Sequence, residues 1–202
     1  QIIKDKFSVL AQAAHSMASP QVRGRGTIAG NICNAVPSAD SAPALLTLDA
    51  KLRLVSLKGQ RTVKIDGFFT GPNESILSNG EILREIQVPP LPANSKGVYL
   101  KLTPRRAMDL AIVGVAAVVI VENGFCKDIR LALGAVSPTP MRVRKAEQIL
   151  RGQKFSDELI ERVAQVSSEE ARPIDDHRAS ADYRRKMVKV LVRRAIQEAL
   201  MN

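Results

Sequence analysis

A proline-rich segment at residues 89–94, with the sequence PPLPAN, most limits how this chain can fold. Proline lacks a backbone N–H donor and fixes φ, so the segment can continue neither a helix nor a central strand. We therefore predict a linker here, with one unit covering residues 1–94 and a second covering residues 95–202.

Before the linker, the hydrophobic pattern changes from helical spacing to alternation. The expected elements are a helix at 6–18 that ends near Ser19-Pro20, a short helix closing at 45–48, a hairpin of 51–57 with 61–65, and a strand at 81–88. The stretch at 21–43 is rich in Gly, Asn, Ser and Pro, and is too irregular to form a long element.

After the linker, three strands are expected at 97–103, 111–121 and 125–133, with an Asn123-Gly124 turn joining the last two. Helices follow at 142–151, where Gly152 ends the helix, after Ser156 and after Ser180. The apolar stripe of the last helix comprises Tyr183, Met187, Val188, Leu191, Ala195 and Leu200. The pattern favours an α+β fold.

Composition excludes several classes of protein. The two cysteines, Cys33 and Cys126, lie far apart and neither belongs to a CxxC pair, which argues against a disulfide framework, a zinc site or an iron–sulfur ligand set. We therefore expect no metal site and a cytoplasmic location. The longest apolar run, 110–121, is shorter than the roughly 20 residues of a membrane span.

The net charge is +10, and residues 96–202 hold 20 basic and 13 acidic groups. Such an excess suggests nucleic acid, an anionic cofactor or an acidic partner subunit.

The stretch TIAGN at 27–31 carries the chemistry. A turn of small residues exposes consecutive backbone N–H groups, and Thr27 and Asn31 add side-chain donors that together can surround a pyrophosphate. A plain turn is the alternative. The overlapping GRGTIA at 24–29 matches the Rossmann pattern GxGxxA, but a helix rather than a strand is expected before it, so we reject a Rossmann site.

The order of motifs along the chain resembles one family. TIAGNICNAVPSAD, AKLRLVSLKGQRTVKIDGFFTG, EIL, YLKLTPRRAMDLAIVGVA, LALGAVSPTPMRVRKAEQIL and DDHRASADYRRKMVKVLVRRA occur in sequence over essentially all 202 residues. They are similar to the FAD-binding medium subunit of the molybdenum hydroxylases, which include xanthine and carbon monoxide dehydrogenases. The resemblance implies the second half of a PCMH-type FAD-binding domain at 1–94. A C-terminal domain at 95–202, with a three-stranded antiparallel sheet and helices, would follow.

The resemblance also assigns roles. Thr27, Ile28, Ala29, Gly30 and Asn31 would surround the FAD phosphates, and Asp40 would accept hydrogen bonds from FAD hydroxyl groups. Leu83 would pack near the flavin, and Lys101 would contact it and stabilise its reduced, anionic form.

Each assignment has a structural alternative. Asp40 could be a helix N-cap, Leu83 plain core, and Lys101 a solvent-facing strand residue. Arg105, Arg106 and Asp109 suggest a local ion-pair network.

Two departures from the family pattern matter. Ala29 stands where glycine is usual, which would cost about 1 kcal/mol if the position needs positive φ. Nothing matches the family's other glycine-rich FAD loop, which lies nearer the N-terminus. We expect that the chain begins inside a longer gene product and that half of the pyrophosphate cradle is missing.

The implied function is electron transfer. Electrons would pass from a molybdenum cofactor in a large subunit, through [2Fe–2S] clusters in a small subunit, to FAD here and then to an external acceptor. The assembly would be a heterotrimer or its dimer, and no side chain of this chain is expected to be catalytic.

Two alternatives stay open. One is a basic nucleic-acid-binding domain built on the helix around Arg184 to Arg194, against which the shortage of aromatic residues argues. The other is a scaffold subunit that docks to its partners without flavin.

Overall fold

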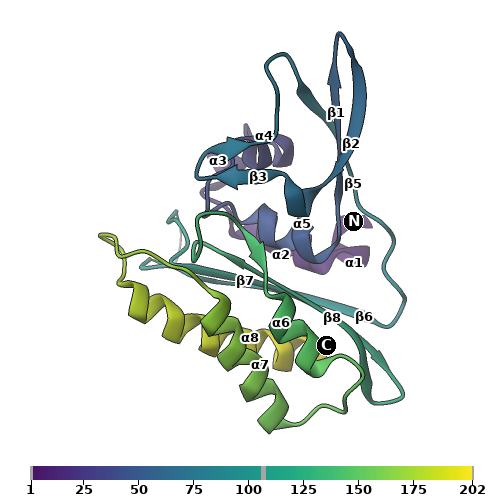
Figure 1. Cartoon of the computed structure of the whole chain (residues 1–202), viewed down its shortest axis with the longest axis vertical. Helices are drawn as coiled ribbons and strands as arrows, with labels where there is room; N and C mark the ends of the chain where they lie inside the picture. The colour runs from purple at the N-terminus through teal and green to yellow at the C-terminus, as the bar shows by residue number, and fades with distance from the viewer. Residues whose placement is uncertain (1, 106–107, 202) are drawn as a thin grey trace.

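The computed structural model describes residues 2–105 and 108–201. The molecule is elongated: a three-stranded sheet forms one end, and a second sheet with three helices forms the other (Figure 1). Residues 88–94 contain no helix or strand, as the prolines predict, and the second sheet begins directly after them. The mixed helix-and-sheet class is confirmed.

Short helices fill the first part of the chain. They are α1 (Ile2–Lys6), α2 (Ser8–Ser16), α3 (Pro20–Arg23), α4 (Ile28–Cys33) and α5 (Ser41–Thr47). The single helix expected at 6–18 is instead interrupted at Phe7, and its main part, α2, ends at Ser16 rather than at residue 18. The side chain of Ser19 caps α3. Helix α4 lies within the irregular stretch, whereas α3 overlaps its start and α5 begins in it. Side-chain caps at Ser19 and Thr27 stabilise α3 and α4, which are too short to show periodicity. Every residue of α5 is buried.

The hairpin and the strand before the linker form one antiparallel sheet in the order β2-β1-β5. Its strands are β1 (Lys51–Ser56), β2 (Gly59–Lys64) and β5 (Ile82–Gln87). Between β2 and β5 lie a 3-10 turn, η1 (Ile65–Gly67), and two short paired strands, β3 (Phe69–Gly71) and β4 (Glu74–Ser75). Leu52 and Leu54 point to the core, as the alternation predicts.

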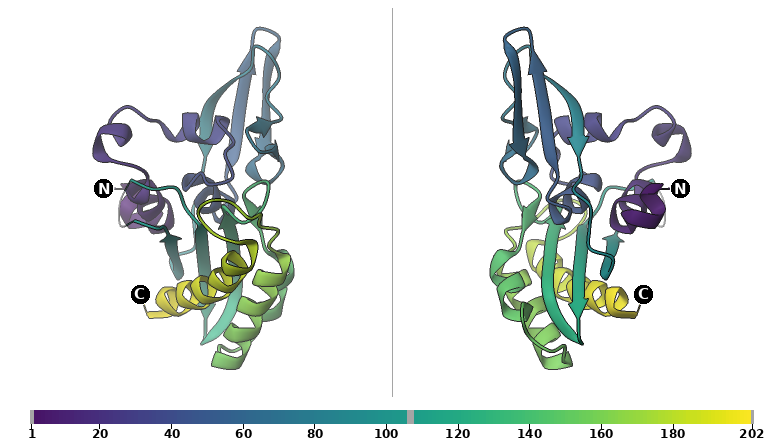
Figure 2. Two further views of the ribbon diagram at one scale, coloured as in Figure 1. Left: turned by 90° about the vertical axis from the view of Figure 1, so that its left-hand side faces the viewer. Right: turned by 90° about the vertical axis from the view of Figure 1, so that its right-hand side faces the viewer.

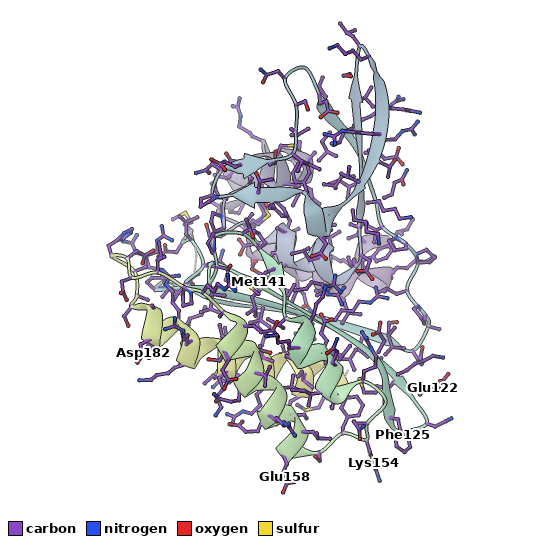
Figure 3. The ribbon with its side chains drawn as sticks, viewed as in Figure 1. Glu122, Phe125, Met141, Lys154, Glu158 and Asp182 are labelled. Atoms are coloured by element: carbon purple, nitrogen blue, oxygen red, sulfur yellow. The ribbon has the colours of Figure 1, made fainter. Side chains whose placement is uncertain are left out.

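The second sheet is antiparallel in the order β6-β7-β8-β9. Its strands are β6 (Ser95–Leu102), β7 (Val113–Glu122), β8 (Phe125–Gly134) and β9 (Met141–Arg142). The three long strands are those expected, and β9 adds two residues at the edge. Asn123 and Gly124 both have positive φ, 53° and 80°, as the tight turn between β7 and β8 requires. Near that turn, Phe125 forms an isolated bridge with Lys154 (Figure 3).

Three helices close the chain: α6 (Arg144–Leu150), α7 (Asp157–Glu170) and α8 (Ala181–Met201). The side chain of Ser156 caps α7, and that of Ser180 accepts a hydrogen bond from the N–H of Tyr183. The predicted stripe of α8 was wrong at Tyr183, which is 43% exposed. The neighbouring Arg184 is buried instead, because its guanidinium donates hydrogen bonds to the backbone carbonyls of Ile112 and Ala135.

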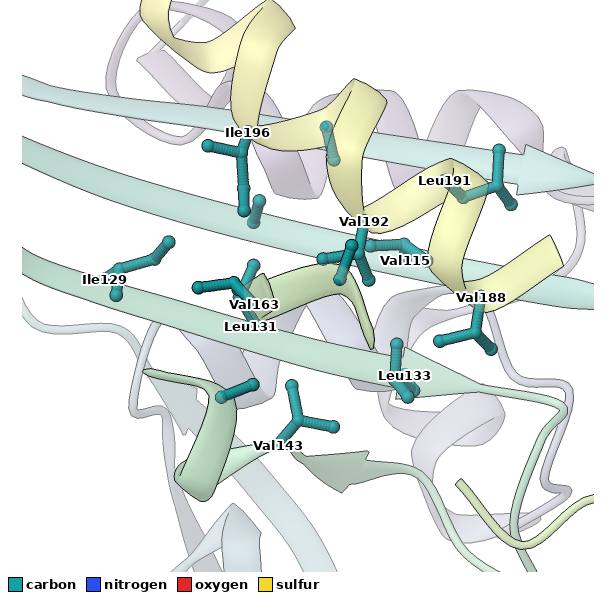
Figure 4. Packing of buried hydrophobic residues seen from close by; sticks show 14 of the residues in the cluster. Val115, Ile129, Leu131, Leu133, Val143, Val163, Val188, Leu191, Val192 and Ile196 are labelled. Atoms are coloured by element: carbon teal, nitrogen blue, oxygen red, sulfur yellow. The ribbon is translucent and has the colours of Figure 1, made fainter. Parts of the chain in front are cut away.

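The second sheet has a hydrophobic core on each face. Alternate residues of β7, such as Val115 and Ala117, pack toward α6, α7 and α8, with Leu131 and Val192 in the same cluster (Figure 4). The intervening Ala116 and Val118 join the core of the N-terminal half. Figure 2 shows these strands between the purple N-terminal helices and the green α6 and α7. Because both halves pack on one sheet, the division at residues 94 and 95 stays a prediction.

Helix α2 covers the free edge of β6. The hydroxyl of Ser8 donates to the carbonyl of Gly97 (2.7 Å), and the N–H of Tyr99 donates to Oε1 of Gln12 (2.7 Å). Four helical residues rise about 6 Å and two strand residues about 6.6 Å, so helix positions 8 and 12 match strand positions 97 and 99. This side-chain pairing satisfies edge groups that would otherwise be open to another strand.

Candidate functional site

The TIAGN segment forms the start of α4. Thr27 is the N-cap, and its Oγ1 accepts a hydrogen bond from the N–H of Gly30 (2.9 Å). The N–H groups of Ile28 and Ala29 precede the first intrahelical bond, and no backbone partner is found for them among residues 2–105 and 108–201. The Thr27 hydroxyl keeps its own proton as a further donor. This end of α4 therefore presents several donors to an anion, as the sequence suggested.

A side chain at position 30 would be crowded, whereas Ala29 is accommodated. Ala29 lies within α4 with negative φ, so the strain considered for this departure is absent. A Cβ on Gly30 would lie 3.1 Å from Oγ1 of Thr27, tighter than most contacts of this kind. Glycine at position 30 thus leaves the cap hydroxyl uncrowded, and position 29 accommodates alanine.

Asn31 joins this segment to the start of α5. Its Oδ1 accepts a hydrogen bond from the hydroxyl of the fully buried Ser41 (2.6 Å), which leaves the amide Nδ2–H groups of Asn31 as donors. Ser41 directly follows Asp40, so the contact holds α4 beside the Asp40 carboxylate. The sequence analysis missed Ser41.

Asp40 is held by two side chains of β6. Its Oδ1 accepts from the hydroxyl of Tyr99 (2.7 Å), and its Oδ2 accepts from Nζ of Lys101 (2.8 Å). Only 7% of the Asp40 side chain and 9% of the Lys101 side chain are exposed. Asp40 does occupy the N-cap position of α5, but its side chain makes no cap hydrogen bond. Lys101 does not face solvent, so that alternative is wrong.

Burial sets the protonation chemistry of this cluster. It raises the pKa of Asp40 above its usual 3.8, while the hydrogen bonds and charge of Lys101 and the bond from Tyr99 oppose the rise. Burial and the neighbouring Asp40 hold the pKa of Tyr99 well above its usual 10. Tyr99 therefore remains a hydroxyl donor at any physiological pH.

Tyr99 is a residue of the candidate site that the sequence analysis did not identify. Tyr99 and Lys101 are two positions apart on β6 and so point to the same face, and this spacing was the available signal. Gly114 of β7 makes room for the ring, because a Cβ there would lie 2.7 Å from the Tyr99 hydroxyl oxygen. The glycine thus lets Tyr99 reach Asp40.

Leu83 lies on β5, is 7% exposed and belongs to the same hydrophobic core as Ile32 of α4 and Tyr99. Its core role is therefore evident, and its expected position beside a flavin stays a prediction. The structure brings α4, Asp40, Lys101 and Leu83 into one continuous region, with β5 packed against α4.

Other residues raised by the sequence lie elsewhere. Nε of Arg105 lies 3.9 Å from Oδ2 of Asp109, whereas Arg106 falls outside the described residues. The described residues contain no group of three or more potential metal ligands. None of their helices combines the length and the apolar content needed to cross a bilayer.

Two family models match consecutive parts of the chain. Residues 1–91 match the FAD binding domain in molybdopterin dehydrogenase, and residues 98–199 match the CO dehydrogenase flavoprotein C-terminal domain. The chain belongs to the FAD-binding medium subunits of the molybdenum hydroxylase family. It is thus a subunit of an oxidoreductase.

Curated relatives and solved structures agree with this family. The chain is 36% identical to the xanthine dehydrogenase FAD-binding subunit of Escherichia coli O157:H7, over 99% of this chain and 70% of that protein. It is 34% identical to the carbon monoxide dehydrogenase medium chain of Hydrogenophaga pseudoflava, over 98% and 69%. A structure of carbon monoxide dehydrogenase from that organism superposes with a TM-score of 0.96 at 36% identity, over 99% and 69% of the two chains.

Proposed function

We propose that this chain holds FAD at the start of α4 and beside the Asp40–Lys101 pair, and passes electrons from [2Fe–2S] clusters of a partner subunit to an external acceptor. FAD, when bound, would supply the redox chemistry. The buried pair of Asp40 and Lys101, adjacent to the open donors of α4, is the observation that carries the proposal.

The residues present fit such a group. Four groups are donors suited to phosphate oxygens: the backbone N–H groups of Ile28 and Ala29, the hydroxyl of Thr27 and the side-chain amide N–H of Asn31. Each Asp40 oxygen has one protein donor and retains a lone pair for a ligand hydroxyl. Lys101 is a fixed cation that would offset negative charge on a bound flavin.

We propose partners from the names of the relatives. A medium chain of carbon monoxide dehydrogenase implies a small iron–sulfur subunit and a large molybdenum subunit, assembled as a heterotrimer or its dimer. The free thiols of Cys33 and Cys126 fit a reducing compartment such as the cytoplasm.

The test is flavin content in the purified complex. Thr27→Ala removes the cap of α4, and we expect about 1 kcal/mol of lost stability together with a clear fall in FAD per chain. Thr27→Ser should restore FAD. Ser156→Ala removes the equivalent cap of α7, so it is the matched control and should lower stability while leaving FAD content unchanged. Equal FAD content in Thr27→Ala and wild type would contradict the proposed phosphate site.

One observation favours a scaffold subunit as the second candidate. Both Asp40 oxygens already bond protein groups, so the cluster is satisfied without flavin. A complex that assembles fully but shows no flavin absorbance would support the scaffold.

The basic side chains of α8 do not favour the nucleic-acid-binding hypothesis. Arg184 is buried, and Lys189 and Arg193 lie within 4 Å of Glu161.

A further inference from the structure

A basic cleft of about 430 Å³ lies between the two halves of the molecule. Its lining comes from α5, β1, β2 and η1 in the N-terminal half and from residues in or near β8, β9 and α6 in the C-terminal half. Figure 1 shows where these elements lie. Three carboxylates line it, those of Asp49, Asp66 and Asp128. Six basic side chains line it as well: Lys51, Lys64, Arg130, Arg142, Arg144 and Arg151.

The carboxylates are already engaged by the arginines. Asp49 lies between Arg130 (2.8 Å) and Arg142 (2.7 Å), and Asp128 lies between Arg130 (3.0 Å) and Arg151 (2.7 Å). Asp66 pairs with Arg144 at 2.5 Å. The acidic side chains of the cleft thus serve to position guanidinium groups.

Lys51 and Lys64 are left without counter-charges. They are direct Cα partners across β1 and β2, and no ion pair involves either of them within residues 2–105 and 108–201. Like charges directly opposite one another destabilise a strand pair. An acidic group from outside the chain would remove this repulsion.

The cleft is separate from the proposed flavin site, because Thr27, Asp40, Leu83 and Lys101 do not line it. Its lining contains no aromatic side chain, so it lacks the stacking surface typical of nucleic-acid sites. Its arginines are fixed by ion pairs. The exposed Pro89 adds apolar surface, whereas Leu46 and Ile65 in the lining are only 1% exposed. Preorganised arginine beside apolar surface is typical of protein interfaces.

We propose that this cleft docks an acidic segment of a partner subunit, with Asp or Glu carboxylates placed against Lys51 and Lys64. The inference rests on the proposed function as one subunit of a larger hydroxylase. The net charge of +10 makes an acidic partner the complementary choice.

Lysine footprinting of the assembled complex tests the proposal. Acetylation of Lys51 and Lys64 by an N-hydroxysuccinimide ester should be several-fold slower in the complex than in the isolated chain, whereas Lys58, in the exposed hairpin turn, should react equally in both. A zero-length carbodiimide should link Lys51 or Lys64 to an Asp or Glu of a partner subunit. Unchanged labelling of both lysines overturns the proposal. So does protection that follows added inorganic phosphate rather than the partner.

Charge reversal provides a second measurement. Lys64→Glu should weaken assembly about tenfold or more and reduce its salt dependence, while Lys58→Glu, with the same change of charge, should not. Flavin absorbance is recorded on the same samples. A colourless complex with protected lysines would contradict only the flavin proposal, and a flavin-containing complex with unprotected lysines would contradict only the docking proposal.

Discussion

At the scale of single residues, Tyr99 is the side chain that orients Asp40, and Tyr99→Phe tests its importance. The variant removes one of the two protein donors to a carboxylate that is 7% exposed. We expect a loss of about 1–3 kcal/mol in the free energy of unfolding, measured by urea titration, and lower FAD content. Tyr183→Phe is the matched control, because the other tyrosine is 43% exposed. Equal stability of both variants would show that the Tyr99 hydroxyl contributes nothing.

Asp176 gives a prediction about pH. Burial opposes its ionisation, but the N–H groups of Arg178 and Ala179 and the guanidinium of Arg184 outweigh burial and lower the pKa to about 2. Because the folded pKa lies below the usual 3.8, this carboxylate stabilises the fold above about pH 4, and the contribution is lost as the pH falls toward 2.

Asp176→Asn should therefore cost about 1.5–3 kcal/mol at pH 7, and the difference from wild type should shrink as the pH falls below 4. Urea unfolding at pH 7, 5, 3.5 and 2.5 measures this. Asp182→Asn alters an exposed pair with Lys186 and should change stability by less than about 0.5 kcal/mol throughout. A constant difference for Asp176→Asn across this range would refute the assigned pKa.

At the scale of elements, Gly97 permits the close approach of α2 to β6. A Cβ at this position would lie 3.1 Å from Cβ of Val9 and 3.3 Å from Oγ of Ser8. We expect Gly97→Ala to lower the free energy of unfolding by about 1–3 kcal/mol and to speed hydrogen exchange in α2. Gly67→Ala, where nothing lies within 4 Å, should be close to neutral. Undisturbed exchange in α2 would contradict this account.

Sequence patterns predicted the elements that neighbouring residues determine, but not the features that depend on contacts between distant parts of the chain. The Asn123-Gly124 turn, the Ser156 cap and the alternation in β1 depend on neighbouring residues, so the sequence identified them correctly. The exposure of Tyr183 accompanies the burial of Arg184, whose partners Ile112 and Ala135 lie far away in the sequence. Periodicity carries no information about such contacts.

At the scale of the whole molecule, the shared sheet predicts cooperative unfolding. Tyr99, Ala116, Val118 and Ala132 belong to the second sheet but pack into the core of the N-terminal half. We expect one urea transition, with far-ultraviolet circular dichroism and Tyr99 fluorescence changing together in the Tyr183→Phe background. Two separated transitions would mean that the halves unfold independently despite their common sheet.

For the candidate site, turn chemistry and the ordered motifs of the family resemblance pointed to TIAGN, Asp40 and Lys101, because such signals are visible along one chain. Their role in binding FAD stays a prediction. Three facts required the folded molecule: the Tyr99 hydroxyl donates to Asp40, a Cβ at Gly30 would crowd the Thr27 hydroxyl, and Lys51 and Lys64 share a cleft with four arginines. Asp40 and Tyr99 are 59 positions apart, and Asp49 and Arg142 are 93 apart. Their contacts form only when the two halves pack on a common sheet, and no local pattern in the chain encodes that packing.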